Sequence, residues 1–424
     1  MTTSPLPRRD DVPALVVRSR RIDVEAPLTS LLPADESTLA WVRRGEGMVG
    51  WGVAATVRTA GPDRFAEAQE WWAEVHDAAV VRDEVRLPGS GLVCLGSFAF
   101  ADSPGDSVLV VPRVVVGRRG GATWVTTVTA TGEVADIGSD VTVTEHEPLA
   151  TGAETVYADG ALSGAEWEGR VAEAVARIEA GEVEKVVLAR DLVAELPEPL
   201  DVRRPLARLA DRYPTCWTFH VDGLFGATPE MLLRRERGLV TSRVLAGTIR
   251  RTGDDDHDSR LAGSLARSSK DLEEHEYAVR SVAEALAPYC SSLTYPEAPF
   301  VLHLPNVMHL ATDVAGVVEG EVTSLALAAA LHPSAAVGGT PTEAALELIS
   351  RLEGMERGRY AGPVGWMDAS GDGEWGIALR SAEVSEDGRS VRLFAGCGIV
   401  AGSDPDAELA ESQAKLVPVR DALA

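Results

Sequence analysis

Three residues near the C-terminus have the types and spacing of a site for a divalent cation. Glu408, Glu411 and Lys415 fall at i, i+3 and i+7 of a predicted helix, so they share one face. The run 403–405, Ser-Asp-Pro, marks the helix start because a capping side chain precedes a proline. On an arbitrary helix such a face is usually solvated. Two carboxylates beside a cation also suit a divalent metal that holds an anionic ligand.

The segment before this helix favours the binding site over the solvated face. Residues 375–384 and 390–399 are predicted strands, and the turn after them is rich in glycine. Glycine lets the backbone come close to a ligand. Tyr360 and Arg380 lie just upstream and supply a hydroxyl and a cation.

Further ionisable residues lie at the ends of other predicted elements. Lys185 stands near the start of a strand, and Glu230 ends a Thr-Pro-Glu turn between two strands. Asp271 and Glu274 are at i and i+3 of a long helix predicted from about 258 to 286, so both can point the same way. Taken singly, each has a simpler explanation, since lysines at strand ends usually contact solvent and Thr-Pro-Glu is a common turn.

Net charge limits the partners that the chain can have. Its formal charge of −25 at pH 7 argues against binding nucleic acid or an anionic membrane. The same field repels a small anionic substrate, so local cations or a bound Mg²⁺ must overcome it at the site. No apolar run is long enough to span a bilayer, and no apolar segment follows the first ten residues, so we expect no secretory signal.

Cysteine spacing indicates a reducing compartment. The four cysteines are far apart and form no CxxC pair, so we expect free thiols in the cytoplasm. They are Cys94, Cys216, Cys290 and Cys397. Cys397 lies close to the candidate site, and we interpret it as a packing residue.

The order of elements predicts an α+β fold. Strands and helices are mixed without a regular βαβ alternation, which favours large, mainly antiparallel sheets. Residues 218–225, 231–235 and 244–250 are among the predicted strands. No GxGxxG follows a strand in the required way and GxxxxGK[ST] is absent, so nucleotide cofactors are disfavoured.

Eight segments, taken together and in order, carry a family resemblance. They are KVVLAR, GATPE, LAGT, SKDxxEH, HPSAAVGGTP, YAGPVGW, ALRSA and AGCGIVAGSDPDAELAESQAKL. This set resembles the chorismate-utilising enzymes, which include isochorismate synthase, salicylate synthase and the first components of anthranilate and aminodeoxychorismate synthase. The resemblance is strong over 155–420 and looser over 1–150. It implies one domain over 1–424, in which two large antiparallel sheets pack as a sandwich with helices outside.

The resemblance also implies a magnesium site that holds chorismate. Glu274 and Glu411 would ligate Mg²⁺, and Asp271 and Glu408 would support it directly or through water. The ion would hold the ring carboxylate of the substrate. Further positions of the family motifs would bind chorismate: Tyr360, Arg380, Gly396 and Lys415 orient its carboxylates, His309 borders the ring, and Gly247 and Thr248 line the place where nucleophile and leaving hydroxyl exchange.

Two positions indicate that water is the nucleophile. Relatives that use ammonia usually carry glutamine where this chain has Lys185, and aminodeoxychorismate synthases often carry lysine at the position of Ala246. We therefore expect isochorismate synthase, serving menaquinone or siderophore biosynthesis, as a monomer without a glutaminase subunit. Salicylate synthase is the rival, because it also uses water and then eliminates pyruvate. Ala336 favours the first, since the salicylate branch tends to have threonine there.

This chemistry needs a base and an acid. Lys185 must be neutral to deprotonate water, and Glu230 must be protonated to release the C4 hydroxyl. Both pKa values must therefore move toward neutrality through burial or nearby charge. Shifts of about 2–3 units are within the range that active sites achieve.

Overall fold

The computed structural model describes residues 13–34, 37–103, 105–130, 143–146, 155–303 and 307–424. Strands throughout these residues join one hydrogen-bonded network, and each described pair is antiparallel except β1 (Leu15–Ile22) with β4 (Val80–Asp83). The hub is β6 (Asp106–Arg119), which pairs with β3 (Glu46–Ala60), β5 (Val93–Ser97) and β7 (Ala122–Ala130).

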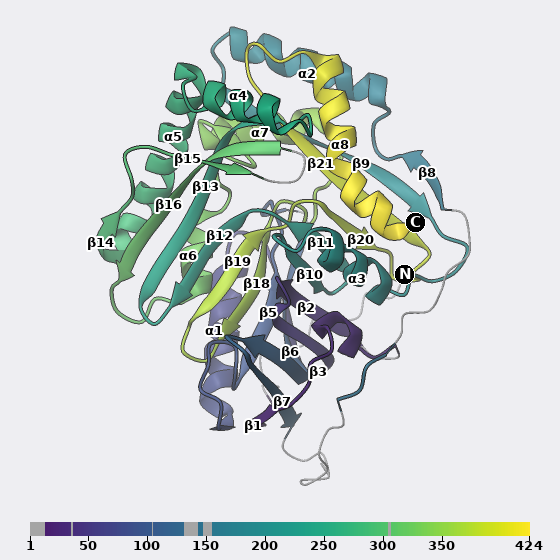
Figure 1. The fold of residues 1–424 in the computed structure, drawn as a ribbon, viewed down its shortest axis with the longest axis vertical. Coiled ribbons are helices and arrows are strands. Elements are labelled where there is room, and N and C mark those ends of the chain that lie inside the picture. The colour runs from purple at the N-terminus through teal and green to yellow at the C-terminus, as the bar shows by residue number, and fades with distance from the viewer. Residues whose placement is uncertain (1–12, 35–36, 104, 131–142, 147–154, 304–306) are drawn as a thin grey trace.

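Two arms of the sheet leave this hub (Figure 1). The first, here the β9 arm, continues from β3 through β2 (Thr38–Arg43), β10 (Trp217–Val221), β11 (Leu224–Thr228), β20 (Ser381–Val384), β21 (Ser390–Ile399) and β9 (Lys185–Glu195), with β8 (Val156–Asp159) and β17 (Gly339–Thr340) on β9. The second, the β16 arm, continues from β5 through β18 (Pro363–Asp368), β19 (Gly373–Ile377), β12 (Met231–Glu236), β13 (Leu239–Arg250) and β16 (Val307–Val318), with β14 (Cys290–Thr294) and β15 (Phe300–His303) on β16.

In Figure 1 the β9 arm lies to the right, the β16 arm to the left and the hub strands below. The helices cover the outside: α1 (Arg64–Ala78), α2 (Gly164–Glu179), α3 (Arg203–Arg212), α4 (Asp255–Leu265), α5 (Ser269–Leu286), α6 (Ser324–Leu331), α7 (Thr342–Leu352) and α8 (Pro405–Leu423), with short 3₁₀ turns at Leu28–Leu31 and Ala287–Tyr289. The expected α+β fold with mainly antiparallel sheets is confirmed. None of the described helices is both long and apolar enough to cross a membrane.

Strands from residues 1–150 pair directly with strands from the rest of the chain. β2 is hydrogen-bonded to β10, and β5 to β18. We therefore propose that the chain forms one domain, as the family resemblance implies.

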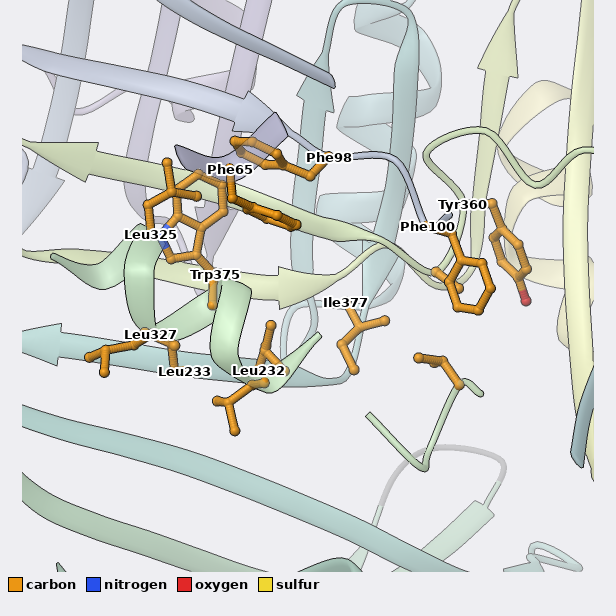
Figure 2. Packing of buried hydrophobic residues seen from close by; sticks show 14 of the residues in the cluster. Phe65, Phe98, Phe100, Leu232, Leu233, Leu325, Leu327, Tyr360, Trp375 and Ile377 are labelled. Atoms are coloured by element: carbon orange, nitrogen blue, oxygen red, sulfur yellow. The ribbon is translucent and has the colours of Figure 1, made fainter. Parts of the chain in front are cut away.

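A buried aromatic cluster ties the hub to the arms (Figure 2). Phe65 of α1 stacks on Phe98 with ring centroids 4.4 Å apart, and Phe98 meets Trp375 edge-on at 5.7 Å. The Trp375 indole donates to Ser324 Oγ over 3.2 Å, so its polar atom is satisfied inside the core. Tyr360 lies at the edge of the cluster in Figure 2, and its ring stacks on Phe394 of β21 at 4.9 Å.

Three predicted elements prove to be interrupted. The helix expected from 258 to 286 is two helices, α4 and α5, because Ser268 caps a new helix by accepting from the Asp271 N–H. The strand expected at 218–225 is a hairpin that turns at Asp222–Gly223, both with positive φ. The strand expected at 375–384 is β19 and β20, separated by residues 378–380.

Candidate active site

The predicted site residues line one cavity between the far ends of the two arms. Its volume is about 870 Å³. The following predicted residues line it: Lys185, Glu230, Gly247, Thr248, Asp271, His309, Ala336, Tyr360, Arg380, Gly396, Glu408, Glu411 and Lys415. The side chain of Glu274 lies outside what the structure describes, so its role as a ligand stays a prediction. Residues more than two hundred positions apart in the chain thus meet at one place.

Lys185 enters the cavity from the first position of β9. Its backbone pairs with Thr340 of β17, and the neighbouring residue pairs with β21. A Cβ added at Gly398 would lie 3.1 Å from the Lys185 Cε. Gly398 therefore leaves the space that the lysine side chain occupies.

Glu230 is held by its backbone in the turn between β11 and β12. Its N–H donates to Thr228 Oγ1 over 3.2 Å, and its carbonyl oxygen accepts from the Ile377 N–H over 3.1 Å. Burial raises the pKa of the Glu230 carboxyl to about 7, although the charges of Lys185, Lys415 and Arg380 oppose that rise. A carboxyl with this pKa is about half protonated at neutral pH. It can therefore donate a proton, which an ordinary glutamate at that pH does not do.

The two carboxylates of α8 face the same cavity. The helix begins as predicted, with the Asp404 side chain accepting from the Ala407 N–H and Pro405 in the first turn. Lys415 Nζ lies 2.6 Å from Glu411 Oε1 and donates to the Gly396 carbonyl oxygen over 2.8 Å. Lys415 thus links α8 to β21.

Glu408 and Glu411 differ in their electrostatic surroundings. Burial alone raises the pKa of Glu411, but the charge and hydrogen bond of Lys415, with help from Arg380, bring that pKa below its usual value. Burial raises the pKa of Glu408, against the hydrogen bond that it accepts from Ser403 over 2.8 Å, and the charge of Glu411 raises it further. A bound cation would relieve this crowding of two carboxylates.

Asp271 approaches from the other side, on α5. The β13–β16 register shifts between Ala246 and Thr248, which marks a β-bulge around Gly247. Gly247 has φ +74°, and a Cβ there would lie 3.2 Å from the Asp271 Cβ. Glycine at this position therefore allows both the bulge and the close approach of the acid.

Thr248 and His309 form a hydrogen-bonded pair across the bulge. Thr248 Oγ1 lies 2.9 Å from His309 Nδ1. Burial lowers the pKa of His309 to about 4, and the nearby cations Arg380 and Lys415 lower it too. The imidazole is therefore neutral at pH 7 and adds no charge to the wall of the cavity.

Arg380 reaches the cavity because the strand before it is broken. It has φ +51°, and its carbonyl oxygen accepts from the Ala227 N–H of β11 over 3.2 Å. Burial lowers the pKa of Arg380. Burial raises the pKa of the Tyr360 phenol, so the phenol is neutral and available as a donor. A Cβ at Gly396 would lie 3.2 Å from the Tyr360 hydroxyl, so the glycine keeps that hydroxyl accessible.

Three arginines of the cavity wall were not predicted from the sequence: Arg250, Arg251 and Arg357. Arg357 is structural, since it pairs with buried Glu353 at 2.5 Å and also donates to backbone carbonyls. Arg250 and Arg251 follow Gly247-Thr248 after a single residue, Ile249, and this spacing was a usable signal. The described lining residues include six lysines and arginines against four acids. The cavity therefore gathers cations in a chain of net charge −25.

Comparison with known proteins identifies the family. The model of the chorismate binding enzyme family matches residues 8–424. The chain belongs to the chorismate-binding enzyme family. Isochorismate synthase DhbC of Bacillus subtilis is 42% identical over 59% of this chain. The salicylate biosynthesis isochorismate synthase of Pseudomonas aeruginosa is 35% identical over 97% of this chain and 91% of its own length.

A solved structure supports the assignment of the fold to this family. The menaquinone-specific isochorismate synthase MenF of Escherichia coli superposes with a TM-score of 0.79 at 26% identity, over 97% of this chain and 95% of its own. The match to the Bacillus protein covers 65% of that relative's length.

Proposed function

We propose that this chorismate-binding enzyme is an isochorismate synthase. Water adds at C2 of chorismate and the C4 hydroxyl leaves as water, so the ring exchanges the position of its hydroxyl without a change in composition. The observation that carries the proposal is the presence of Lys185 and Glu230 in one cavity, with the pKa of Glu230 at about 7.

The two residues divide the proton transfers. Neutral Lys185 takes a proton from the attacking water, and protonated Glu230 gives its proton to the leaving hydroxyl. After one turnover the lysine is protonated and the glutamate is ionised, and proton exchange with solvent restores both. Lys185 is close enough to Glu230 that its charge, once it is protonated, acts to lower the pKa of that carboxyl.

Other residues would bind and orient chorismate. We assign Arg380 and Lys415 to its carboxylates, because a guanidinium fork matches a carboxylate with two hydrogen bonds. Tyr360 donates through its neutral hydroxyl, and the backbone at Gly396 stays accessible. Gly247, Thr248 and neutral His309 form the wall beside the ring.

The carboxylate set of the cavity fits Mg²⁺. Magnesium prefers oxygen ligands and binds through a few carboxylates, often keeping waters. Donor atoms of Glu408 and Glu411 lie in a group within 4.8 Å of one another, and Asp271 lines the same cavity. We assign Glu411 and Glu274 as ligands, with Asp271 and Glu408 in support. When bound, the ion supplies positive charge that holds the ring carboxylate.

Lys185 and Ala246 favour water over ammonia, so we propose that the chain works without a glutaminase subunit, as a monomer. All four cysteines are free thiols, which fits the cytoplasm. The product would serve menaquinone or siderophore biosynthesis.

Product analysis tests the proposal. Purified protein is mixed with chorismate, with and without Mg²⁺ and with and without ammonium, and the products are separated. We expect isochorismate that depends on Mg²⁺ and is indifferent to ammonium. Salicylate and pyruvate would instead assign the chain to the salicylate branch, which Ala336 in the cavity wall disfavours. Anthranilate or aminodeoxychorismate would overturn the water nucleophile.

A further inference from the structure

A thiol lies among the carboxylates of the proposed magnesium site. Donor atoms of Cys397, Glu408 and Glu411 all lie within 4.8 Å of one another. Magnesium has little use for this sulfur, because it is a hard cation that prefers oxygen. The cluster therefore contains a donor that the proposed function does not employ.

The fold places this thiol under α8. Gly396 and Gly398 of β21 line the cavity, whereas Cys397 between them is buried and donates its S–H to the Glu408 carbonyl oxygen over 3.4 Å. Packing explains why the side chain is small. The sulfur is in addition within reach of two carboxylates, which packing does not require.

We propose that Cys397, Glu408 and Glu411 form a site for a thiophilic divalent cation of the Zn²⁺ and Cd²⁺ class, which competes with Mg²⁺. Zinc binds thiolate sulfur at about 2.3 Å and carboxylate oxygen at about 2.0–2.2 Å. Tetrahedral bonds of these lengths place donor atoms about 3.5 Å apart. Small rotations of the two partly exposed glutamates therefore bring all three donors onto one ion. Binding breaks the S–H bond, forms a sulfur–metal bond and releases one proton to solvent.

The positive charge of Lys415 weakens the binding of a dication at this cluster. Its Nζ lies 2.6 Å from Glu411 Oε1 and 3.9 Å from Cys397 Sγ, so its charge repels a dication at the cluster. Glu411 still has a second oxygen, and Lys415 keeps its bond to the Gly396 carbonyl. The site is therefore weaker than one made only of thiolates, and an excess of Mg²⁺ can displace its ion.

Binding of the thiophilic ion and inhibition by that ion depend on different premises. Binding of the thiophilic ion follows from the cluster alone. Inhibition by that ion rests on the proposed function, because it requires Glu411 to hold the working Mg²⁺. The test measures binding and inhibition separately.

Cadmium is the probe, since a Cd²⁺–thiolate bond gives an ultraviolet charge-transfer band. Metal-free protein, kept reduced with a phosphine, is titrated with Cd²⁺. We expect a band that saturates at one equivalent in the wild type and in Cys94→Ser, and no band in Cys397→Ser. Cys94 is a matched control, because it is a buried thiol that also donates to a backbone carbonyl, that of Met367, over 3.6 Å. Saturating Mg²⁺ should weaken Cd²⁺ binding at least about 10-fold.

A second measurement on the wild type covers a failure of Cys397→Ser to fold. Both thiols are buried, so alkylation is followed by mass spectrometry in sub-denaturing urea, where opening of the fold exposes them, and Cd²⁺ should slow the alkylation of Cys397 while leaving that of Cys94 unchanged. A band that persists in Cys397→Ser, or Cd²⁺ binding that ignores Mg²⁺, overturns the inference. So does a Cys397 that Cd²⁺ does not protect.

Turnover of chorismate then tests the inhibition. Each variant is normalised to its own rate with Mg²⁺, and Cd²⁺ should inhibit the wild type and Cys94→Ser at about 10-fold lower concentration than Cys397→Ser. Equal inhibition of all three overturns the competitive role. If no isochorismate forms while the Cd²⁺ band appears, the proposed function fails and the metal site stands. The reverse result rejects the metal site alone.

Discussion

Glu230 and Glu411 line the same cavity, yet their surroundings drive their pKa values in opposite directions. Glu230 is partly buried in the cavity wall, and desolvation of its carboxyl raises the pKa to about 7. Glu411 is also partly buried, but Lys415 contacts it at 2.6 Å and its pKa falls. Two residues of one type therefore suit two tasks in one cavity, that of a proton donor and that of a charged ligand.

The backbone that carries each glutamate fits its task. Glu230 sits in a turn that two backbone hydrogen bonds hold, so its carboxyl keeps its place without a side-chain partner. Glu411 lies on a helix whose periodic face also presents Glu408 and Lys415. A rigid turn places one isolated acid, whereas a helix places a group of charges at fixed spacing.

The largest expected effect comes from removing the acid or the base. Lys185→Ala and Glu230→Gln should each lower kcat by about 10²–10⁴-fold, because each removes one proton transfer. The KM for chorismate should change much less, since neither residue is assigned to its carboxylates. Initial rates of isochorismate formation measure both constants. Glu236→Gln, at the outer end of β12, is the matched control, and near-normal turnover in either variant would reject the assignment.

Removal of the negative charge of Glu411 should weaken the binding of Mg²⁺. Glu411→Gln should raise the Mg²⁺ concentration for half-maximal activity by about 10–100-fold, and Glu408→Gln by less. Ser403→Ala removes one hydrogen bond to Glu408 and one from the Val400 N–H but leaves both carboxylates in place, so it should have the smallest effect of the three. Mg²⁺ activation curves and calorimetric titration measure this order. Unchanged half-activation in Glu411→Gln would contradict the assignment of the ligand.

The raised pKa of Glu230 should also cost stability at high pH. Its pKa rises from 4.5 to about 7 on folding, so the folded state binds the proton more tightly. The stability that this proton contributes is lost as pH rises through that window. Glu230→Gln should therefore be more stable than the wild type by roughly 1–3 kcal/mol at about pH 8, and no more stable near pH 4.5. Urea unfolding at both pH values tests this. A less stable glutamine variant at the higher pH would mean that the ionised carboxylate is stabilised in the cavity.

The part of the site that the sequence predicted best depends on local signals. The cap at Asp404, the proline after it and the i, i+3, i+7 spacing all act within one helix, and α8 forms as expected. The strand 390–399 was also placed correctly, as β21. The other site residues came from the family resemblance, because the distances between their elements are not visible in local patterns.

What the sequence did not predict depends on contacts between distant segments. The break that turns Arg380 into the cavity is held by the Ala227 N–H of β11, which lies far away in the chain. Local propensity favours a continuous strand there, and the long-range bond prevails. The end of α4 is different, because its signal is local: Ser268 accepts from the Asp271 N–H and starts a new helix, and the prediction of one helix from about 258 to 286 did not use this signal. Arg357 has one nearby partner, Glu353, but its bonds to the carbonyls of Val187 in β9 and of Val337 join segments that are distant in the sequence.

The smallest expected effect concerns Thr248 and His309, which are assigned to positioning the ring and not to the tasks of the two glutamates. Thr248→Val keeps the shape of the side chain but removes its hydrogen bond to His309 Nδ1, which spans 2.9 Å. Because Thr248 is exposed to the cavity, water can replace the lost partner, and kcat/KM should fall only about 3–10-fold. Thr248→Ser should retain most of the activity. A loss as large as that of Glu230→Gln would place Thr248 in the proton transfers. An unchanged rate would show that the hydrogen bond between Thr248 and His309 is not needed to position the ring.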